Sequence, residues 1–284
     1  MNSPRRRLDV ELVRRGLVAG RAQAATAVMQ GRVTVNGVIA QKPARLVLAA
    51  DAVELAGPPA RYVSRGGQKL QGALEAFCLD VGGLRCCDVG ASTGGFTDCL
   101  LQHGAAHVVA VDVGRAQMHE RLAADDRVTL YERTDIRNVD PTAIGAQFDL
   151  VTADLSFISL RAVMGVLASL VAPNGSVVVL VKPQFEVGRV EASRARGVIC
   201  NPDLWQAAIV QVLDAATSAS FVPKAAIVSP LKGAQGNVEF FLHLQLGDEF
   251  GDERLVIPRH LEIDEHTVRA ILRRAQQYSG SSDG

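Results

Sequence analysis

The stretch Cys87-Asp88-Val89-Gly90-Ala91-Ser92-Thr93-Gly94-Gly95-Phe96 decides the fold, because it runs from an apolar strand into the start of a helix. Glycines at such a turn permit a tight backbone and a close approach to a ligand. The spacing is Asp-Val-Gly-x-x-x-Gly-Gly, which differs from the Gly-x-Gly-x-x-Gly of dinucleotide enzymes. The loop alone predicts a nucleotide-type cofactor and leaves NAD open.

Strands and helices alternate around this loop. Apolar runs predict strands at 85–89, 107–112, 127–132, 148–153, 176–181, 224–229 and 238–246, and helices at 67–77, 95–102, 116–122, 159–170 and 202–218. This alternation predicts an α/β fold with a mostly parallel, Rossmann-like sheet and helices on both faces. Only residues 230–237 separate the last two strands, which predicts a terminal antiparallel hairpin. Such a hairpin is typical of methyltransferases that use S-adenosylmethionine.

Acidic residues after the next strands complete a cofactor site. Asp112 ends the second strand, where a carboxylate accepts both hydroxyls of a ribose, and Asp135 follows the third strand, where we expect it to meet the adenine. Asp112 and the terminal hairpin favour S-adenosylmethionine over NAD. The expected cofactor-binding residues are Gly90, Ala91, Ser92, Thr93, Gly94, Gly95, Phe96, Asp112, Val113, Asp135 and Asp154.

Four charged residues are expected to meet at the same edge of the sheet. Asp154 and Lys182 follow the fourth and fifth strands, Glu239 is near the start of the antiparallel last strand, and Lys69 lies early in the helix before the first strand. A ribose hydroxyl is a poor nucleophile, so it needs a general base or a charge that stabilises the developing alkoxide. We expect Lys182 to act on the hydroxyl in one of these two ways.

The first 70 residues are basic although the whole chain is neutral. They hold 12 Lys and Arg against 4 Asp and Glu, a net charge of +8, and the remainder carries −8. A basic segment suits a polyanion such as RNA, and a solvated surface explains the charge equally well. Periodicity and the Asn36-Gly37 turn predict a small αα-β module with helices at 8–15 and 21–30 and strands at 32–35, 38–39 and 52–55.

These motifs resemble two known modules. Lys69, Asp154, Lys182 and Glu239 match in order the Lys-Asp-Lys-Glu tetrad of FtsJ-like ribose 2′-O-methyltransferases. Arg7-Leu8-Asp9, Arg15-Gly16 and Gly31-Arg32-Val33-Thr34-Val35-Asn36-Gly37 resemble an α+β S4 RNA-binding domain. The chain is similar to the TlyA family through these and through Ser64-Arg65-Gly66-Gly67-Gln68-Lys69-Leu70, Asp154-Leu155-Ser156-Phe157-Ile158-Ser159-Leu160 and Lys182-Pro183-Gln184-Phe185-Glu186-Val187-Gly188.

The resemblance covers residues 6–246. It implies transfer of a methyl group from S-adenosylmethionine to a cytidine ribose 2′-hydroxyl in large-subunit, and in some members small-subunit, ribosomal RNA. The implied partners are ribosomal RNA or ribosomal subunits, and some members carry the name hemolysin. Two departures are visible: Gly20 stands where S4 domains usually have Ser, and Ala60-Arg61-Tyr62-Val63 replaces a tryptophan-bearing linker known in some relatives.

The expected domain boundaries follow from these motifs. Residues 6–57 form the S4-like domain, 58–63 the linker, 64–247 the methyltransferase domain, and 248–284 a C-terminal extension with a disordered end. We expect a loop with Arg189, Arg194 and Arg196 to order over the substrate. The expected RNA-binding residues are Arg5, Arg6, Arg7, Arg14, Arg15, Arg21, Arg32 and Arg65.

Two alternative functions are a membrane-lytic protein, as the name hemolysin suggests, and an NAD-dependent enzyme fused to an RNA-binding module. The sequence has no signal peptide and no run of about 20 apolar residues, which favours a cytoplasmic protein without membrane contact. Its five Cys form no CxxC pair and no metal spacing, so we expect no metal. Cys86 and Cys87 are expected to be small apolar fillers in a reducing compartment.

Overall fold

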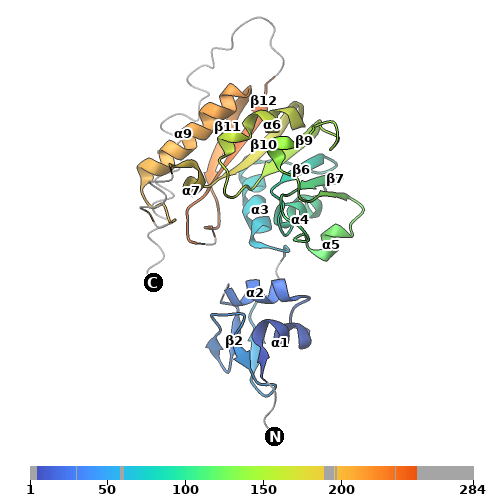
Figure 1. Cartoon of the computed structure of the whole chain (residues 1–284), viewed down its shortest axis with the longest axis vertical. Coiled ribbons are helices and arrows are strands. Elements are labelled where there is room, and N and C mark those ends of the chain that lie inside the picture. The colour runs from blue at the N-terminus through green and yellow to red at the C-terminus, as the bar shows by residue number, and fades with distance from the viewer. Residues whose placement is uncertain are drawn as a thin grey trace, which may run out of the picture. The chain divides into compact units, whose positions relative to one another are not determined.

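The structure is a computed structural model that describes residues 5–29, 31–57, 61–188, 195, 197–233 and 235–247 (Figure 1). The chain divides into two compact units, and the division falls between Ser64 and Arg65. The expected disorder of the C-terminal end and the expected loop with Arg189, Arg194 and Arg196 lie outside the described residues. Each unit is described by itself below.

The smaller unit packs two helices on short strands. Helices α1 (Leu8–Arg14) and α2 (Arg21–Met29) bury Leu8, Leu12 and Val28 against Val33. Strands β2 (Val33–Val35), β3 (Val38–Ile39) and β5 (Val53–Leu55) form one antiparallel sheet. The predicted helices and strands are confirmed with bounds one residue shorter for α1, α2, β2 and β5, as helix and strand ends fray.

A second, two-stranded sheet in this unit was not predicted. It pairs β1 (Arg6–Arg7) with β4 (Leu46–Val47) in antiparallel register. Strands of two residues carry no alternation of apolar and polar side chains, so periodicity cannot detect them. The pairing fixes the backbone at the start of α1, where the basic residues are concentrated.

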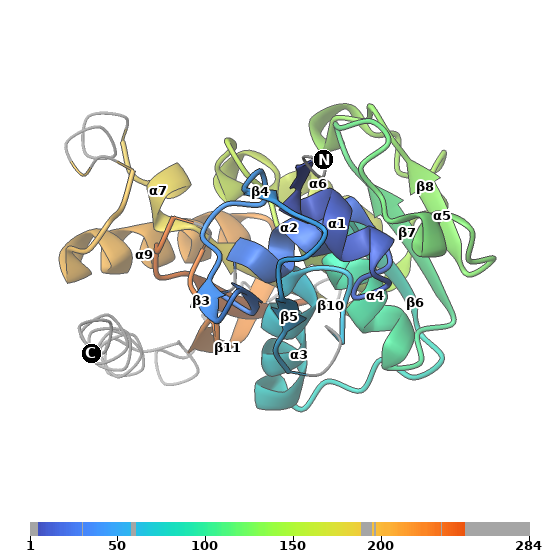
Figure 2. The same cartoon turned by 90° about the horizontal axis from the view of Figure 1, so that it is seen from below.

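The larger unit is built on a seven-stranded sheet with the order β11-β12-β10-β9-β6-β7-β8. Strands β6 to β10 run parallel, and β12 is antiparallel to β10 and β11, which confirms the fold class and the terminal hairpin. Strands β11 and β8 end the sheet, and in Figure 2 β8 lies to the right of β11. The bounds are β6 (Arg85–Val89), β7 (His107–Val111), β8 (Val128–Tyr131), β9 (Phe148–Ala153), β10 (Val171–Val181), β11 (Phe221–Val228) and β12 (Phe240–Leu246).

Helices cover both faces of this sheet, as two neighbouring residues of β12 show. The Phe240 ring lies 6.0 Å from Trp205 of α9 (Pro202–Ser218), and the Phe241 ring lies 6.0 Å from Phe96 of α4 (Gly95–Gln102). Because successive strand residues point to opposite faces, α9 and α4 cover opposite faces. Helix α3 (Arg65–Phe77) packs on α4, and α6 (Met164–Leu170) packs on α9.

Three helical predictions need correction. The helix expected at 116–122 is α5 (Glu120–Ala123), because Ala116 has a left-handed φ of 52° that no helix tolerates. The helix expected at 159–170 is split into η2 (Leu160–Ala162) and α6, because Val163 between them has φ −121°. Helix α3 begins two residues earlier than expected. The short helices η1 (Ile136–Asn138) and α7 (Pro183–Glu186) were not predicted.

The strand predictions differ at their ends. Strand β10 begins five residues before the predicted 176–181, and its register to β9 shifts between Val171 and Ser176. Strand β11 begins at Phe221 and contains Pro223, which an edge strand tolerates at the irregularity seen there. Strands β7 and β8 are shorter than 107–112 and 127–132, and β12 starts two residues after the expected Val238.

The centre of the sheet buries a carboxylic acid. Asp88 of β6 is fully inaccessible, and its Oδ2 accepts hydrogen bonds from Thr97 N at 2.9 Å and Thr97 Oγ1 at 2.6 Å. Burial raises the pKa of Asp88 to about 7, although these two hydrogen bonds favour the charged form. Asp88 thereby fixes the first turn of α4 beneath the glycine-rich loop.

We expect this carboxyl to make stability depend on pH. The pKa of Asp88 in the folded protein lies above the ordinary 3.8. The protonated carboxyl therefore contributes its full stabilisation of the fold below about pH 4, and this stabilisation is lost as the pH rises to about 7. Asp88→Asn keeps an acceptor for Thr97 and does not titrate. Urea unfolding at about pH 5 and about pH 8 should show the variant gaining stability relative to wild type at the higher pH. Parallel changes in both proteins would contradict this assignment.

Candidate functional site

Loops from five strands of the larger unit meet at one edge of the sheet. Gly90, Asp112, Asp154 and Lys182 directly follow β6, β7, β9 and β10, whose carboxyl ends stand together because these strands are parallel. Glu239 directly precedes the antiparallel β12 and therefore joins the same edge. Its carbonyl accepts a hydrogen bond from Ser229 N at 2.8 Å, which continues the pairing with β11.

The glycine-rich loop passes very close to the loop after β9. Gly90 has φ +83°, and a Cβ there would lie 2.6 Å from the Asp154 carbonyl oxygen. Gly94 has φ +91°, and a Cβ there would meet Met118 and Leu122. Both positions therefore require glycine, which lets the loop pack directly against the loop after β9 and against Met118 and Leu122.

Asp112 is already oriented by this loop. Its Oδ2 accepts Ser92 N at 2.8 Å and its Oδ1 accepts Gly114 N at 2.6 Å. A carboxylate has about four lone-pair positions, so two remain for ligand hydroxyls. Val113 beside it is an exposed apolar side chain.

Asp135 lies after β8, as the sequence predicted, but its carboxylate is engaged locally. It accepts Arg137 N at 3.0 Å, caps η1, and forms an ion pair with the Arg137 guanidinium at 2.5 Å. This guanidinium lowers the pKa of Asp135 to about 2. The acid is thus held charged by its own neighbour.

The four charged residues form two ion pairs. Lys69 Nζ lies 2.5 Å from Glu239 Oε2, and both side chains are almost fully buried. Lys182 Nζ lies 2.6 Å from Asp154 Oδ1 and donates a hydrogen bond to Ser156 Oγ at 2.9 Å. The sequence predicted that these four residues share an edge, and the structure adds which lysine pairs with which acid.

Asp154 Oδ1 is buried and makes no directed hydrogen bond, although the ammonium of Lys182 is close. Its partner is therefore the Lys182 ammonium at 2.6 Å, which supplies the charge that a buried carboxylate oxygen needs. Asp112, whose two carboxylate oxygens are oriented and keep free lone pairs, makes this edge suitable for a cofactor that carries hydroxyl groups.

Gly233 supports Glu239 from the loop between β11 and β12. A Cβ at Gly233 would meet Glu239 Oε1, with Glu239 Cδ 3.2 Å away. Gly233 N also donates a hydrogen bond to Asn237 O at 2.8 Å. The glycine therefore leaves the space that the buried carboxylate occupies. Sequence reasoning missed this residue because nothing in the local pattern marks its contact.

Sequence reasoning also missed side chains in the loops that carry Asp154 and Lys182. Phe157 has a left-handed φ of 65°, is 92% exposed, and lies 5.2 Å from the Phe185 ring. An exposed aromatic ring in a strained backbone offers a surface on which a base can stack. Its position inside the Asp154–Leu160 string was the available signal.

Glu186 joins these two loops. It is 3% exposed, accepts Ser159 Oγ at 2.5 Å and Leu160 N at 2.8 Å, and lies 3.7 Å from Arg161. Burial raises the pKa of this carboxyl against the effect of those hydrogen bonds. Glu186 therefore fixes the Asp154 loop to the Lys182 loop.

The arginines expected to bind RNA differ in how they are held. Arg5 is exposed, Arg6 belongs to β1, and Arg32 donates to Ala56 O at 3.0 Å. Arg65 of the larger unit donates to Lys232 O at 2.7 Å. The remaining four form ion pairs with two buried acids of the smaller unit, namely Arg7 and Arg21 with Asp9, and Arg14 and Arg15 with Glu11.

Two features are absent from the part of the chain that the structure describes. Within the described residues, no group of His, Cys, Asp and Glu has the arrangement of a metal site. Among the same residues, no helix has the length and apolarity needed to span a membrane. Cys86 and Cys87 are buried free thiols, in the positions expected of apolar fillers.

Comparisons with known proteins agree on both units. The family of FtsJ-like methyltransferases matches residues 62–246, and the S4 domain family matches residues 6–53. The chain is 47% identical over 242 residues to the 16S/23S rRNA (cytidine-2′-O)-methyltransferase TlyA of Mycobacterium tuberculosis, covering 85% of this chain and 90% of that protein.

Two further relatives extend over nearly the whole chain. A putative rRNA methyltransferase, YqxC of Bacillus subtilis, is 39% identical over 263 residues, or 90% of this chain and 93% of that protein. The solved structure of a putative hemolysin from Streptococcus thermophilus is 34% identical, with a TM-score of 0.74 over 99% of this chain and 100% of that one. These matches and the site geometry show that the chain belongs to the TlyA family of S4-domain, FtsJ-like methyltransferases, which use S-adenosylmethionine.

Proposed function

We propose that this protein transfers a methyl group from S-adenosylmethionine to a cytidine ribose 2′-hydroxyl in ribosomal RNA. The observation that carries the proposal is the pair of ion pairs, Lys69–Glu239 and Lys182–Asp154, at the edge that holds the glycine-rich loop. The names of the relatives supply the substrate class. Ribosomal RNA or a ribosomal subunit is the proposed partner, and that substrate implies a cytoplasmic location.

The bound S-adenosylmethionine supplies an electrophilic methyl group. Asp112 is proposed to hold the ribose hydroxyls of this cofactor, and the backbone between Gly90 and Phe96 to enclose its amino-acid part. Asp135 and Val113 are proposed to contact its adenine. These roles are supported by the orientation of Asp112, whose two oxygens are each fixed by one backbone N–H.

Lys182 is proposed to touch the target hydroxyl. A ribose hydroxyl must lose its proton as the new O–C bond forms, so it needs a base or a neighbouring positive charge. Asp154 positions Lys182 from 2.6 Å, and Ser156 Oγ accepts one of its N–H groups. Lys69 and Glu239 form the second ion pair of the site. Because this pair is buried, its charges are fixed in position, and it is proposed to orient the substrate ribose.

The amino-terminal unit is proposed to supply RNA affinity. Its residues carry most of the positive charge of the first 70 residues, and counterion release makes such binding depend on salt. Phe157 is a further candidate contact, since its exposed ring lies in the loop that follows Asp154. Both features suit a nucleic-acid substrate, which offers phosphates to the arginines and bases to the ring.

The proposal is tested by mapping ribose methylation. Ribosomal RNA and purified ribosomal subunits incubated with the protein and S-adenosylmethionine should gain a 2′-O-methylcytidine that mass spectrometry locates. Lys182→Ala should remove this product, with a loss of at least about a thousandfold in rate, while calorimetry shows S-adenosylmethionine still bound. Lys224→Ala, at an exposed position on β11, is the matched control and should act like wild type. Near-normal turnover by Lys182→Ala would refute the assignment.

Gly233→Ala should separate catalysis from cofactor binding. The added methyl meets Glu239 Oε1, so the Lys69–Glu239 pair must shift while Asp112 and the Gly90 loop are untouched. We expect kcat to fall by about tenfold or more with an unchanged Kd for S-adenosylmethionine.

A matched glycine variant controls for this change. A Cβ added at Gly165 of α6 would have nothing within 4 Å, so Gly165→Ala should leave kcat unchanged and raise helix stability slightly. If Gly233→Ala and Gly165→Ala give the same kcat, Glu239 is not held by this contact.

A further inference from the structure

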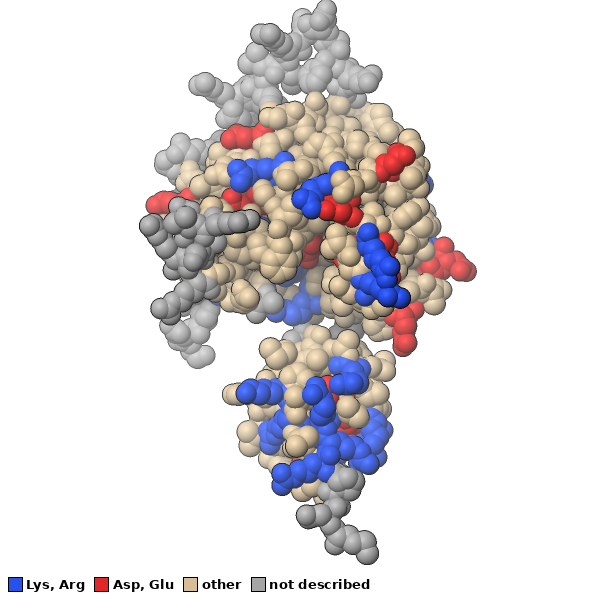
Figure 3. Space-filling view, viewed as in Figure 1, with Lys and Arg blue, Asp and Glu red and all other residues tan. Residues whose placement is uncertain are grey.

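Two buried acids lie among the basic residues of the S4 domain. The Asp9 side chain is 6% exposed and the Glu11 side chain 1% exposed, yet each makes ion pairs with two arginines. The face of this domain in Figure 3 is dominated by Lys and Arg, with little acidic surface between them. Acids at such a position need an explanation, because each weakens the attraction of the surface for a polyanion.

Asp9 holds two guanidinium groups from different elements, Arg7 of β1 and Arg21 of α2. Arg7 donates from Nε and Nη2 to the two carboxylate oxygens at 3.0 and 2.9 Å, and Arg21 Nη2 donates to Oδ2 at 3.1 Å. The Asp9 carboxylate itself is fixed by Val10 N at 2.9 Å. Arg7 and Arg21 remain 47% and 62% exposed, so their other N–H groups face the solvent.

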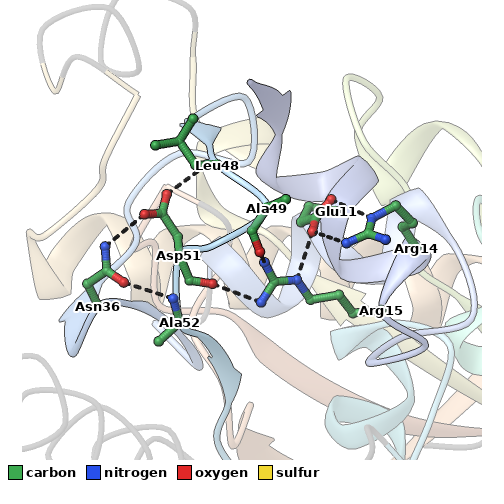
Figure 4. A network of polar contacts seen from close by, with 8 residues as sticks. All are labelled: Glu11, Arg14, Arg15, Asn36, Leu48, Ala49, Asp51 and Ala52. Carbon is green, nitrogen blue, oxygen red and sulfur yellow. Dashed lines mark hydrogen bonds and ion pairs between the residues drawn. The ribbon is translucent and has the colours of Figure 1, made fainter. Parts of the chain in front are cut away.

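Glu11 holds Arg14 and Arg15, which follow it by about one helical turn, as Figure 4 shows. Arg14 donates from Nε and Nη2 at 2.8 and 2.6 Å, and Arg15 donates from Nε at 2.8 Å. The two arginines then differ. Arg14 is 50% exposed, whereas Arg15 is 21% exposed and also donates to Asp51 O and Ala49 O at 2.9 and 3.0 Å.

The hydrogen bonds of Arg15 connect two parts of the domain to each other. They connect α1 to the turn before β5, where Asp51 also accepts Leu48 N at 2.8 Å and Asn36 Nδ2 at 3.0 Å. Arg15 therefore has few N–H groups left for a ligand. Arg7, Arg14 and Arg21 keep exposed guanidinium edges, and each is held in place by its own acid.

We infer that Asp9 and Glu11 are positioning residues that fix Arg7, Arg21 and Arg14 as a preformed array for RNA phosphates, with Arg15 as its internal support. This inference rests on the proposed function, because it takes RNA as the ligand. Each acid carries one negative charge against two guanidinium groups, which leaves one positive charge per cluster. The arginines are ordered before binding, so less side-chain freedom is lost when a phosphate arrives.

The charge state of both acids fits this role. The guanidinium of Arg7 lowers the pKa of Asp9 to about 2, and that of Arg14 does the same for Glu11. Both carboxylates therefore stay charged at every pH at which RNA binding is measured. The array has a geometry that titration does not alter near neutral pH.

Asp9→Asn and Glu11→Gln test the inference, because charge and geometry give opposite results. Each variant makes the domain more positive, so simple attraction gives tighter RNA binding. Loss of positioning instead raises KM for ribosomal RNA by about tenfold with unchanged kcat, and makes the slope of log K against log salt shallower by about one. Binding of heparin, a polyanion without a phosphate backbone, should stay equal or tighten.

Glu54→Gln is the matched control. It removes one exposed negative charge from β5 of the same domain, and Glu54 has no arginine pair in the part of the chain that the structure describes. It should leave KM equal or slightly lower. If Asp9→Asn and Glu11→Gln behave like Glu54→Gln while wild type methylates ribosomal RNA, the positioning role is wrong. If wild type itself does not act on RNA, the proposed function fails instead.

Three arginine variants cover the case in which the acid variants do not fold. Arg14→Lys keeps the charge but lacks the forked contact with Glu11, and should raise KM without lowering the unfolding temperature. Arg15→Ala should lower the unfolding temperature and change the salt slope less than Arg14→Ala. Equal effects of Arg14→Ala and Arg15→Ala on the salt slope would overturn the division between array and support.

Discussion

The close approach of two backbones, at Gly90 and at Asp154, is the constraint on which the methyltransferase site depends. Asp154 N donates to Val89 O at 3.0 Å, and a Cβ at Gly90 would lie 2.6 Å from the Asp154 carbonyl. This contact ties the glycine-rich loop after β6 to the loop after β9 that carries Asp154. In the proposed reaction it sets the separation between the methyl donor and the Lys182–Asp154 pair, which in-line methyl transfer requires.

Much of the fold could be predicted because periodicity and terminal signals agreed. Strands β6 and β9 and helices α4 and α9 have the predicted bounds, and Asn201 before Pro202 caps α9 by accepting Asp203 N at 2.9 Å. Two of the misplaced ends lie near residues that take unusual backbone angles, Ala116 before α5 and Asn174 near the start of β10. Those angles depend on tertiary packing, which a residue pattern does not contain.

The candidate site also has a part that the sequence could predict and a part that it could not. The order of the parallel strands was enough to place Asp154 and Lys182 at one edge, since strand ends fix the position of the residues that follow them. The choice of partners could not be predicted, because it depends on where α3 starts and on space that Gly233 leaves for Glu239. In the S4 domain, the proposed roles of Asp9 and Glu11 could not be predicted from the net charge. A net charge subtracts the acids from the arginines and does not show which acid holds which arginine.

Pro223 in β11 has a consequence for how copies of this protein meet one another. Strand β11 ends the sheet in the described part of the chain, and an edge strand exposes main-chain groups that invite another strand to pair. A proline has no N–H to donate, and the shift of register beside it bends the strand out of line. The predicted strand began at Lys224, just after this proline, whereas β11 begins at Phe221. Pro223 therefore makes this edge a poor template for aggregation.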